Sequence, residues 1–266
     1  GCRFKPGSEC VRGRGSSQCL RQAALLEAIE HGSSRGKPWG DEATGRAAQV
    51  ITVGTYRMPT VSVIIPAYNQ GQYLSDAVQS VLRQTYADLE ILVVDDGSTD
   101  NTRNVALAFN DARVRYVFQE NRGLSAARNT GIRLARGSFL TYLDSDDRFL
   151  PAKLSLLLAA FEKTPALGFV AGQAILVDER GRALGEVFDR GLPDDTSELL
   201  LGNPLHVGSV LLRREWQERV GLFDETLRSY EDWDMWLRLA KAGCMMGWVP
   251  HPVSLYRFHV AQMTRL

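Results

Sequence analysis

Acidic side chains crowd together at one point of the sequence, where they could hold a cation. Asp144, Asp146 and Asp147 lie within four residues, and carboxylates this close repel one another unless a divalent cation lies among them. Magnesium and manganese are usually bound by a few carboxylate oxygens and completed by substrate phosphates. The spacing therefore indicates a metal–phosphate site, although a solvated acidic turn that caps the next helix explains the same residues equally well.

Two further acidic pairs could take part in chemistry. Asp95 and Asp96 follow an apolar run; one of them can cap the next helix, and an acidic residue there can also hydrogen-bond a ribose or a base. Glu231 and Asp232 begin an amphipathic segment, where helix electrostatics alone would favour acidic residues. In a partly closed pocket, a carboxylate at this position could instead accept the proton of a sugar hydroxyl as a general base.

Basic side chains that suit phosphate lie close to these acidic groups in the sequence. Arg122 and Arg128 follow an apolar run over 114–118, and arginine binds phosphate through paired hydrogen bonds. Surface solvation explains Arg122, whereas Arg128 lies on a predicted helix that is otherwise lined by small and apolar residues. Arg257 and His259, near the end of the chain, could reach a metal or a diphosphate, but a lone histidine is more often structural.

The first half of the chain alternates between short apolar runs and helical spacings that would position these groups. We predict strands and helices in the order 61–65, 71–84, 89–94, 99–109, 114–118, 123–136 and 138–143. Ser98 or Thr99 is expected to cap the second of these helices, and Gly137 to end the third. The alternation favours an open parallel sheet, in which ligands bind beyond the carboxyl ends of the strands. The polar loops that leave those ends therefore mark the site.

The second half is less regular and predicts mixed pairing within the same domain. We expect helices over 151–163 and 231–242, the second ended by Gly243. Strands are expected over 169–177, 183–188, 206–212, 248–249 and 253–258, the first two as a hairpin. The fold class is α/β, with a mostly parallel sheet flanked by helices and a mixed C-terminal half.

Composition excludes several classes of protein. Lys plus Arg and Asp plus Glu both number 31 among 266 residues, so nothing points to a nucleic-acid partner. A hydrophobic content of 44% is enough for a sizeable core, and no apolar run reaches the roughly 18 residues of a membrane-spanning helix. The sequence therefore predicts a globular domain that does not itself cross a membrane.

The first 57 residues differ from the rest. They carry nine Lys and Arg against five Asp and Glu, are rich in Gly and Ser, and precede Met58 and the first strand. We expect 1–57 to be a basic, unstructured extension outside the fold, and 58–266 to be the domain; a targeting or membrane-contact arm is the alternative. The four cysteines, Cys2, Cys10, Cys19 and Cys244, have spacings of neither a zinc site nor a redox pair, so free thiols in a reducing compartment are expected.

Five motifs resemble those of the inverting family 2 glycosyltransferases, which have the GT-A nucleotide-diphospho-sugar-binding fold, a Rossmann-like sheet. They occur in the family's order and spacing, and the resemblance covers roughly 59–264. The motifs are Val-Ser-Val-Ile-Ile-Pro-Ala-Tyr-Asn at 61–69, Val-Val-Asp-Asp-Gly-Ser-Thr-Asp at 93–100, Asn-Arg-Gly-Leu-Ser-Ala-Ala-Arg-Asn-Thr-Gly at 121–131, Leu-Asp-Ser-Asp-Asp at 143–147 and Glu-Asp-Trp-Asp-Met-Trp at 231–236.

The resemblance implies binding roles for the nucleotide end of the donor. Pro66, Ala67 and Tyr68 would border the base, with Tyr68 able to stack on it. Asp96 would hydrogen-bond the base, usually uracil in this family. Arg128 would lie near the diphosphate.

The resemblance also implies roles at the reacting end. Asp144 would approach the ribose or the sugar, and Asp146 would bind a divalent metal, Mn2+ or Mg2+, to which His259 in the closing Tyr-Arg-Phe-His motif would add a ligand. Asp232 would be the base that deprotonates the acceptor hydroxyl. The expected reaction is transfer of a sugar, with inversion, from a UDP-sugar to a polysaccharide, glycolipid or related acceptor.

Two alternatives and a location complete these expectations. The chain ends at Leu266, where relatives commonly continue with helices that close over the acceptor or contact the membrane, so a truncated nucleotide-sugar-binding module with little turnover is the alternative. A nucleotidyltransferase would be expected to have a glycine-rich loop after the first strand, which 66–71 does not supply. We expect the protein in the cytoplasm, with peripheral association at the inner face of the membrane.

Overall fold

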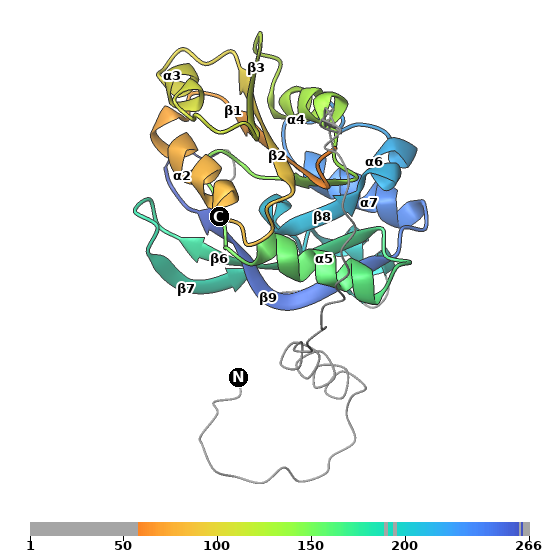
Figure 1. Cartoon of the computed structure of the whole chain (residues 1–266). Helices are drawn as coiled ribbons and strands as arrows, with labels where there is room; N and C mark the ends of the chain where they lie inside the picture. Colours follow the sequence, from red (N-terminus) through yellow and green to blue (C-terminus); the bar gives the residue numbers. More distant parts are fainter. Residues whose placement is uncertain (1–57, 189–190, 194–195, 261, 263–266) are drawn as a thin grey trace, which may run out of the picture. The chain divides into compact units, whose positions relative to one another are not determined.

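One mixed sheet runs through the part of the chain that the structure, a computed structural model, describes: residues 58–188, 191–193, 196–260 and 262. Its nine strands are β1 (Val61–Ala67), β2 (Leu89–Asp96), β3 (Val114–Gln119), β4 (Phe139–Tyr142), β5 (Arg148–Phe149), β6 (Phe169–Val177), β7 (Ala183–Phe188), β8 (Val210–Arg213) and β9 (Met246–Arg257). Their order is β3-β2-β1-β4-β8-β6-β9-β5, with β7 paired to β6 (Figure 1). The extension predicted over 1–57, with three of the cysteines, lies outside the described residues.

The predicted parallel half is confirmed. β1 lies between β2 and β4 and is parallel to both, and β3 is parallel to β2. Every residue of β1 and β2 is buried, as expected for apolar runs covered on both faces. Beyond β4 the sheet turns mixed, because β8 runs antiparallel to both β4 and β6. The carboxyl ends of β1, β2 and β4 therefore open onto one edge of the sheet.

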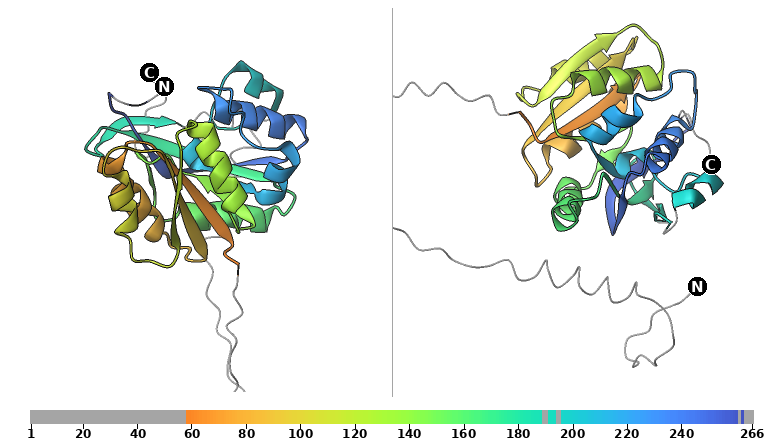
Figure 2. Two further views of the ribbon diagram at one scale, coloured as in Figure 1. Left: turned by 90° about the horizontal axis from the view of Figure 1, so that it is seen from above. Right: turned by 90° about the vertical axis from the view of Figure 1, so that its right-hand side faces the viewer.

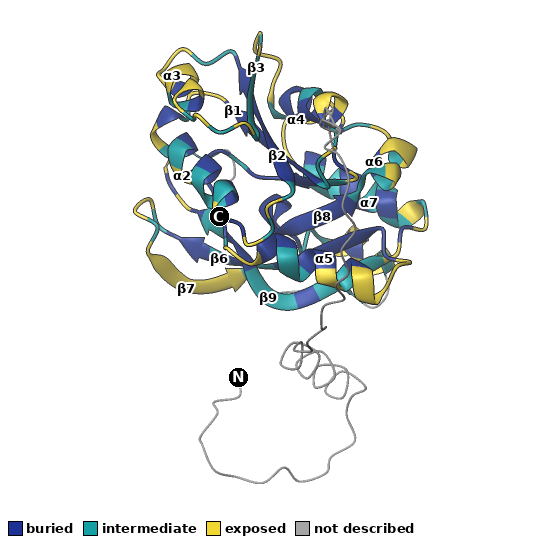
Figure 3. Cartoon of the chain, viewed as in Figure 1, coloured by how far each residue is buried: buried dark blue, intermediate teal, exposed yellow. Residues whose placement is uncertain are grey.

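Helices cover both faces of the sheet (Figure 2). They are α2 (Gly71–Leu82), α3 (Thr102–Leu107), α4 (Leu124–Leu134), α5 (Lys153–Lys163), α6 (Arg214–Val220) and α7 (Glu231–Lys241), with the 3-10 helices η1 (Thr196–Leu201) and η2 (Val207–Ser209). Alternation along β1 separates two cores: Val63 and Ile65 pack with α2 and α5, whereas Ile64 packs with α4 and α7. Figure 3 shows the resulting buried central strands, with β7 exposed at the margin.

The second half departs from the prediction where tertiary contacts override local pattern. The hairpin of β6 and β7 is confirmed, and Gly243 follows α7 with φ +81°. The strand predicted over 206–212 begins instead as η2 and becomes extended only at Val210. The two short strands predicted near the end are one strand, β9, whose pairing with β6 shifts register around Pro250 and Pro252, where backbone donors are missing. Helices α6 and η1 were not predicted.

Two predicted helix boundaries are wrong. α3 begins at Thr102, so neither Ser98 nor Thr99 caps it; the Asp100 carboxylate instead accepts from the backbone N–H groups of Thr102, at 2.9 Å, and Gly71, at 3.0 Å. α4 ends at Leu134, before Gly137. Gly137 does not cap the helix; it allows the backbone to lie close to that of Ser62, because a Cβ at Gly137 would lie 2.6 Å from the Ser62 nitrogen.

No helix within the described residues is both long enough and apolar enough to cross a membrane.

Lys153 is a buried amine with neutral partners. Its Nζ donates to Thr141 Oγ1 at 2.8 Å and to the Gly208 carbonyl at 2.7 Å, and it lies 3.5 Å from the centre of the Phe149 ring. The side chain is fully buried, and this burial lowers the pKa of Lys153 well below its usual value. The folded protein therefore binds fewer protons at this residue than the unfolded chain.

Replacing Lys153 with Met should make the free energy of unfolding vary less with pH in the alkaline range. Because the unfolded chain binds more protons at this residue than the folded protein does, wild-type stability should rise with pH below the unfolded pKa, by up to about 1.4 kcal/mol per pH unit. In urea unfolding between about pH 7 and about pH 9.5, the free energy of unfolding of the wild type should rise relative to that of Lys153→Met. Lys163, on the same helix, is exposed, so the difference in free energy of unfolding between the wild type and Lys163→Met should not change with pH. A change as large as that found with Lys153→Met would contradict the lowered pKa of Lys153.

Gly131 allows α4 to lie directly on β1. A Cβ at this position would come 2.4 Å from Ile64 Cγ2, so Gly131→Ala should lower the free energy of unfolding by about 1–3 kcal/mol through overpacking, although alanine is the better helix former. Gly202→Ala is the control, since an added Cβ there meets no atom within 4 Å. Equal unfolding midpoints for the two variants in urea would show that the helix has room to move.

Candidate active site at the strand ends

Three segments that are far apart in the sequence are linked by charge pairs. They are the loop after β4, the first turn of α7 and the residues that follow β9. Arg128 on α4 pairs with Asp144 and with Glu231, and His259 pairs with Asp146. Tyr68 and Asp96 stand at the ends of the neighbouring strands β1 and β2. The structure thus gathers most of the predicted residues at one edge of the sheet.

Arg128 joins two carboxylates within the protein. Its side chain is 1% exposed, and it donates from Nη2 to Asp144 Oδ1 at 2.7 Å and from Nη1 to Glu231 Oε1 at 2.5 Å. Burial lowers the pKa of Arg128, but Asp144 and Glu231 outweigh burial and raise it overall. The guanidinium therefore stays charged and holds the start of α7 against the end of β4. Contact with a diphosphate stays a prediction.

The acidic group after β4 divides into two parts. Asp144 and Asp146 remain partly exposed, whereas Asp147 turns inward, accepting from the Arg257 backbone N–H at 2.7 Å and lying 3.0 Å from His206 Nε2. Burial raises the pKa of Asp147 to about 7, although the hydrogen bond with His206 opposes the rise. Asp147 thus anchors the loop to β9, a role that the sequence did not indicate.

Asp146 and His259 are the residues that could hold a metal. Asp146 Oδ2 lies 2.9 Å from His259 Nε2, and the imidazole ring packs on Tyr73, with 5.0 Å between ring centres. Burial and then Asp144 raise the pKa of Asp146, while His259 opposes them. A carboxylate oxygen and an imidazole nitrogen suit Mn2+, and two protein ligands leave positions for phosphate oxygens. In the described part of the chain, no group of three or more His, Cys, Asp or Glu side chains is placed to hold a metal ion, and metal binding by Asp146 and His259 stays a prediction.

Arg257 shapes the acidic loop from behind. Its guanidinium donates to the backbone carbonyls of Asp146, at 2.7 Å, and Glu179, at 2.5 Å, and to Asp76 Oδ2 at 3.1 Å. The side chain is 3% exposed and lies over the Tyr73 ring. From the sequence, Arg257 was expected to be able to reach a metal or a diphosphate. In the structure these contacts engage its guanidinium, which holds the loop in place.

Asp232 lies in the first turn of α7, beside a residue that the sequence did not reveal. Its Oδ2 accepts from Asn203 Nδ2 at 3.1 Å, and its Oδ1 accepts from the Trp233 backbone N–H at 2.7 Å. Burial raises the pKa of Asp232, Glu231 raises it further, and Arg128 opposes them. A carboxylate with a raised pKa is a stronger base once ionised. Asn203 lies in an irregular segment after η1, where no sequence pattern marks it.

Asp96 orders the loop that leads to α4. Its carboxylate is 3% exposed and accepts from Gln119 Nε2 at 2.7 Å and from the backbone N–H groups of Arg122, at 2.9 Å, and Gly123, at 2.8 Å. Its neighbour Asp95 accepts from Tyr116 and from the N–H of the following turn. A hydrogen bond that the Asp96 carboxylate accepts from a base stays a prediction.

The residues expected around the base differ in exposure. Pro66 and Ala67 are buried as the last residues of β1, and contact with a base stays a prediction for both. Tyr68, the next residue, is 50% exposed. Its ring is therefore accessible, and stacking on a base stays a prediction.

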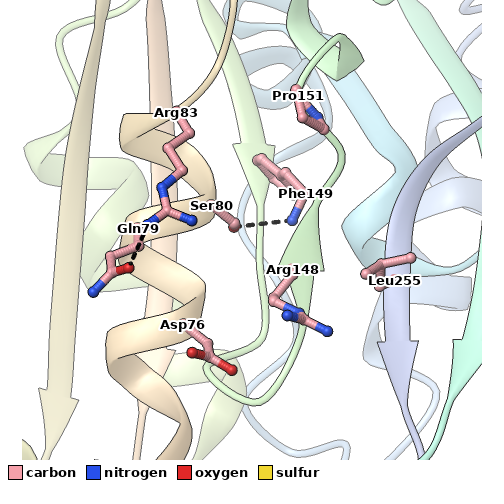
Figure 4. A pocket seen from close by; sticks show the side chains of 8 residues that line it. All are labelled: Asp76, Gln79, Ser80, Arg83, Arg148, Phe149, Pro151 and Leu255. Carbon is pink, nitrogen blue, oxygen red and sulfur yellow. Dashed lines mark hydrogen bonds between the residues drawn. The ribbon is translucent and has the colours of Figure 1, made fainter. Parts of the chain in front are cut away.

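A small surface pocket lies apart from these residues, between α2, β5 and β9 (Figure 4). Its volume is about 170 Å3. It is lined by Asp76, Gln79, Ser80, Arg83, Arg148, Phe149, Pro151 and Leu255. The predicted site residues are not among them, and we assign this pocket no ligand.

Comparison with known proteins gives the family. The model of glycosyl transferase family 2 matches residues 62–196, and that of glycosyl transferase family group 2 matches 139–264. An Escherichia coli chondroitin synthase is 36% identical over 190 residues, covering 70% of this chain and 27% of the synthase. A Pasteurella multocida hyaluronan synthase is 35% identical over 190 residues, covering 70% of this chain and 19% of that synthase.

Other relatives agree with this result. An uncharacterized glycosyltransferase of Rickettsia prowazekii is 31% identical, covering 77% of this chain and 66% of that protein, whereas the chain spans 32% of a Rickettsia felis relative. Residues 1–349 of Staphylococcus aureus TarS, solved with UDP-GlcNAc, share the fold with a TM-score of 0.64 at 20% identity, covering 76% of this chain and 60% of that fragment. The chain therefore belongs to glycosyltransferase family 2 and has the GT-A fold.

Proposed function

We propose that this chain transfers a sugar from a UDP-sugar to a hydroxyl group of a saccharide or lipid-linked acceptor, with inversion at the anomeric carbon. The observation that carries the proposal is the Arg128 bridge, which ties Asp144 after β4 to Glu231 beside Asp232. A donor site and a base are thereby held together. The names of the relatives, chondroitin and hyaluronan synthases, and the UDP-GlcNAc complex of TarS support a UDP-sugar donor and a saccharide product.

The strand ends supply the donor site in this proposal. Tyr68 would stack on the base and Asp96 would approach it, while Asp144 would face the ribose or the sugar. Asp146 and His259 would hold Mn2+ or Mg2+, whose charge would balance the negative charge that builds up on the departing diphosphate. Binding of the nucleotide away from the reacting carbon would orient the sugar for attack.

Asp232 would act on the acceptor. As the acceptor oxygen bonds to the anomeric carbon, its proton passes to an Asp232 carboxylate oxygen, and the carbon–oxygen bond to the UDP leaving group breaks on the opposite face. The configuration at this carbon inverts, through a transition state with oxocarbenium character like that of glycoside hydrolysis. Asn203 holds one carboxylate oxygen of Asp232 at 3.1 Å, which fixes its orientation.

Asp232→Asn should abolish transfer and leave donor binding in place. An amide cannot accept the acceptor proton, and general-base catalysis contributes about 10²–10⁴-fold, so kcat should fall by at least that factor while the Kd for UDP stays the same. Asp234→Asn is the matched control, because Asp234 lies in the same helical turn and pairs with Arg238 on the surface. UDP release in the presence of acceptor measures the turnover. Wild-type turnover in Asp232→Asn would refute the assignment of the base.

Glu231→Gln should move the acid limb of the kcat/KM profile to lower pH. Glu231 raises the pKa of Asp232 and neutralises Arg128, which lowers it. Loss of the Glu231 charge therefore lowers the pKa of Asp232 in two ways: it removes a repulsive neighbour, and it leaves the charge of Arg128 less compensated. Asp232 then stays ionised at lower pH. Thermal unfolding checks that the variant is folded, and Asp234→Asn should leave the profile in place. An acid limb that is unmoved, or that moves to higher pH, would contradict this coupling.

A further inference from the structure

Tyr230 has an unusual backbone conformation immediately before the acidic pair of α7. It is the N-cap residue of that helix, with φ 62° and ψ 18°, in the left-handed region that disfavours residues with a Cβ. Its side chain is nevertheless 65% exposed, so core packing does not account for a large aromatic residue there. Strained residues of this kind are concentrated at functional sites.

The exposed ring is held beside a second aromatic side chain. The ring centres of Tyr230 and Trp233 are 6.0 Å apart, in a T-shaped arrangement, as residues three apart at a helix start can be. Trp233 is itself fixed, because its Nε1 donates to the Leu199 carbonyl of η1 at 2.7 Å. The pair is therefore a rigid, partly exposed aromatic surface.

The same segment that fixes Trp233 also fixes Asp232. Asn203, two residues beyond η1, donates to Asp232 Oδ2, and η1 lies beside α7 (Figure 2). Trp233 and Asp232 therefore both face the segment 199–203, and Tyr230 continues the surface from Trp233. An aromatic surface, an amide side chain and a carboxylate with a raised pKa meet at the beginning of α7.

This combination suits a sugar ring better than an alkyl chain. A pyranose has C–H groups on its faces, which pack on the electron-rich faces of aromatic rings, and hydroxyls around its rim, which need polar partners. We propose that Tyr230, Trp233 and Asn203 form an acceptor subsite, which binds the terminal pyranose of a saccharide and presents its hydroxyl to Asp232. The subsite rests on the proposed function, since it assigns the acceptor of the same reaction.

Oligosaccharide binding to the full chain tests the subsite. The probes are chondroitin and hyaluronan hexasaccharides, titrated with and without UDP and Mn2+ and followed by tryptophan fluorescence. We expect the wild type to bind at least one probe, and Tyr230→Asn to weaken binding by about fivefold to tenfold through loss of one aromatic contact. Asparagine tolerates the left-handed conformation, so this variant should unfold at no lower temperature than the wild type.

Two controls separate the ring from general surface effects. Tyr230→Phe keeps the aromatic face and should bind within about twofold of the wild type, well inside the change expected from losing the ring. Leu184→Asn, at a 49% exposed position on β7, should leave the affinity unchanged. A loss in either control as large as that in Tyr230→Asn would overturn the subsite.

The titrations also separate failure of the subsite from failure of the proposed function. The subsite is overturned if neither probe binds the wild type, or if Tyr230→Asn binds as tightly as the wild type. Binding of phosphatidylglycerol vesicles that depends on Tyr230, with unchanged oligosaccharide binding, would also overturn it in favour of a lipid surface. Lack of UDP binding to the folded wild type would instead count against the proposed donor, whatever the oligosaccharides do.

Discussion

A single buried guanidinium couples the groups on which the proposed chemistry depends. Arg128 reaches Asp144 at the end of β4 and Glu231 at the start of α7, so the sheet edge is tied directly to the helix that carries Asp232. Removing one partner of a buried ion pair typically costs about 3–5 kcal/mol, because the other charge is left without compensation. The close approach of α4 to β1, which Gly131 permits, places the guanidinium between the two carboxylates.

The fold of the first half could be predicted because its determinants are local. Apolar runs such as 61–65 predict buried strands, and helical spacings such as 71–84 predict helices with one apolar face. The observed bounds of these elements differ from the predicted ones by only a few residues. The second half depends on contacts between distant segments. η2 replaces the first part of the strand predicted over 206–212 and follows His206, whose ring pairs with Asp147. No pattern around 206 in the sequence predicts that contact.

The site was predictable in its residue types and less so in its pairings. Spacing marked Asp144, Asp146 and Asp147 as one acidic cluster, but it could not show that Asp147 turns inward or that the Arg257 guanidinium donates to backbone carbonyls. Partners are set by tertiary structure, which brings residues from opposite ends of the domain together. The left-handed backbone of Tyr230 was equally hidden, because no glycine or asparagine marks the turn.

Calorimetric titration of UDP into the purified chain tests whether the strand ends form a metal-dependent UDP-sugar site. With Mn2+ present, we expect saturable binding, which weakens strongly when EDTA replaces the metal, as expected if Asp146 and His259 hold a cation against the diphosphate. No binding of UDP with Mn2+ present, by a chain that thermal unfolding shows to be folded, would exclude such a site.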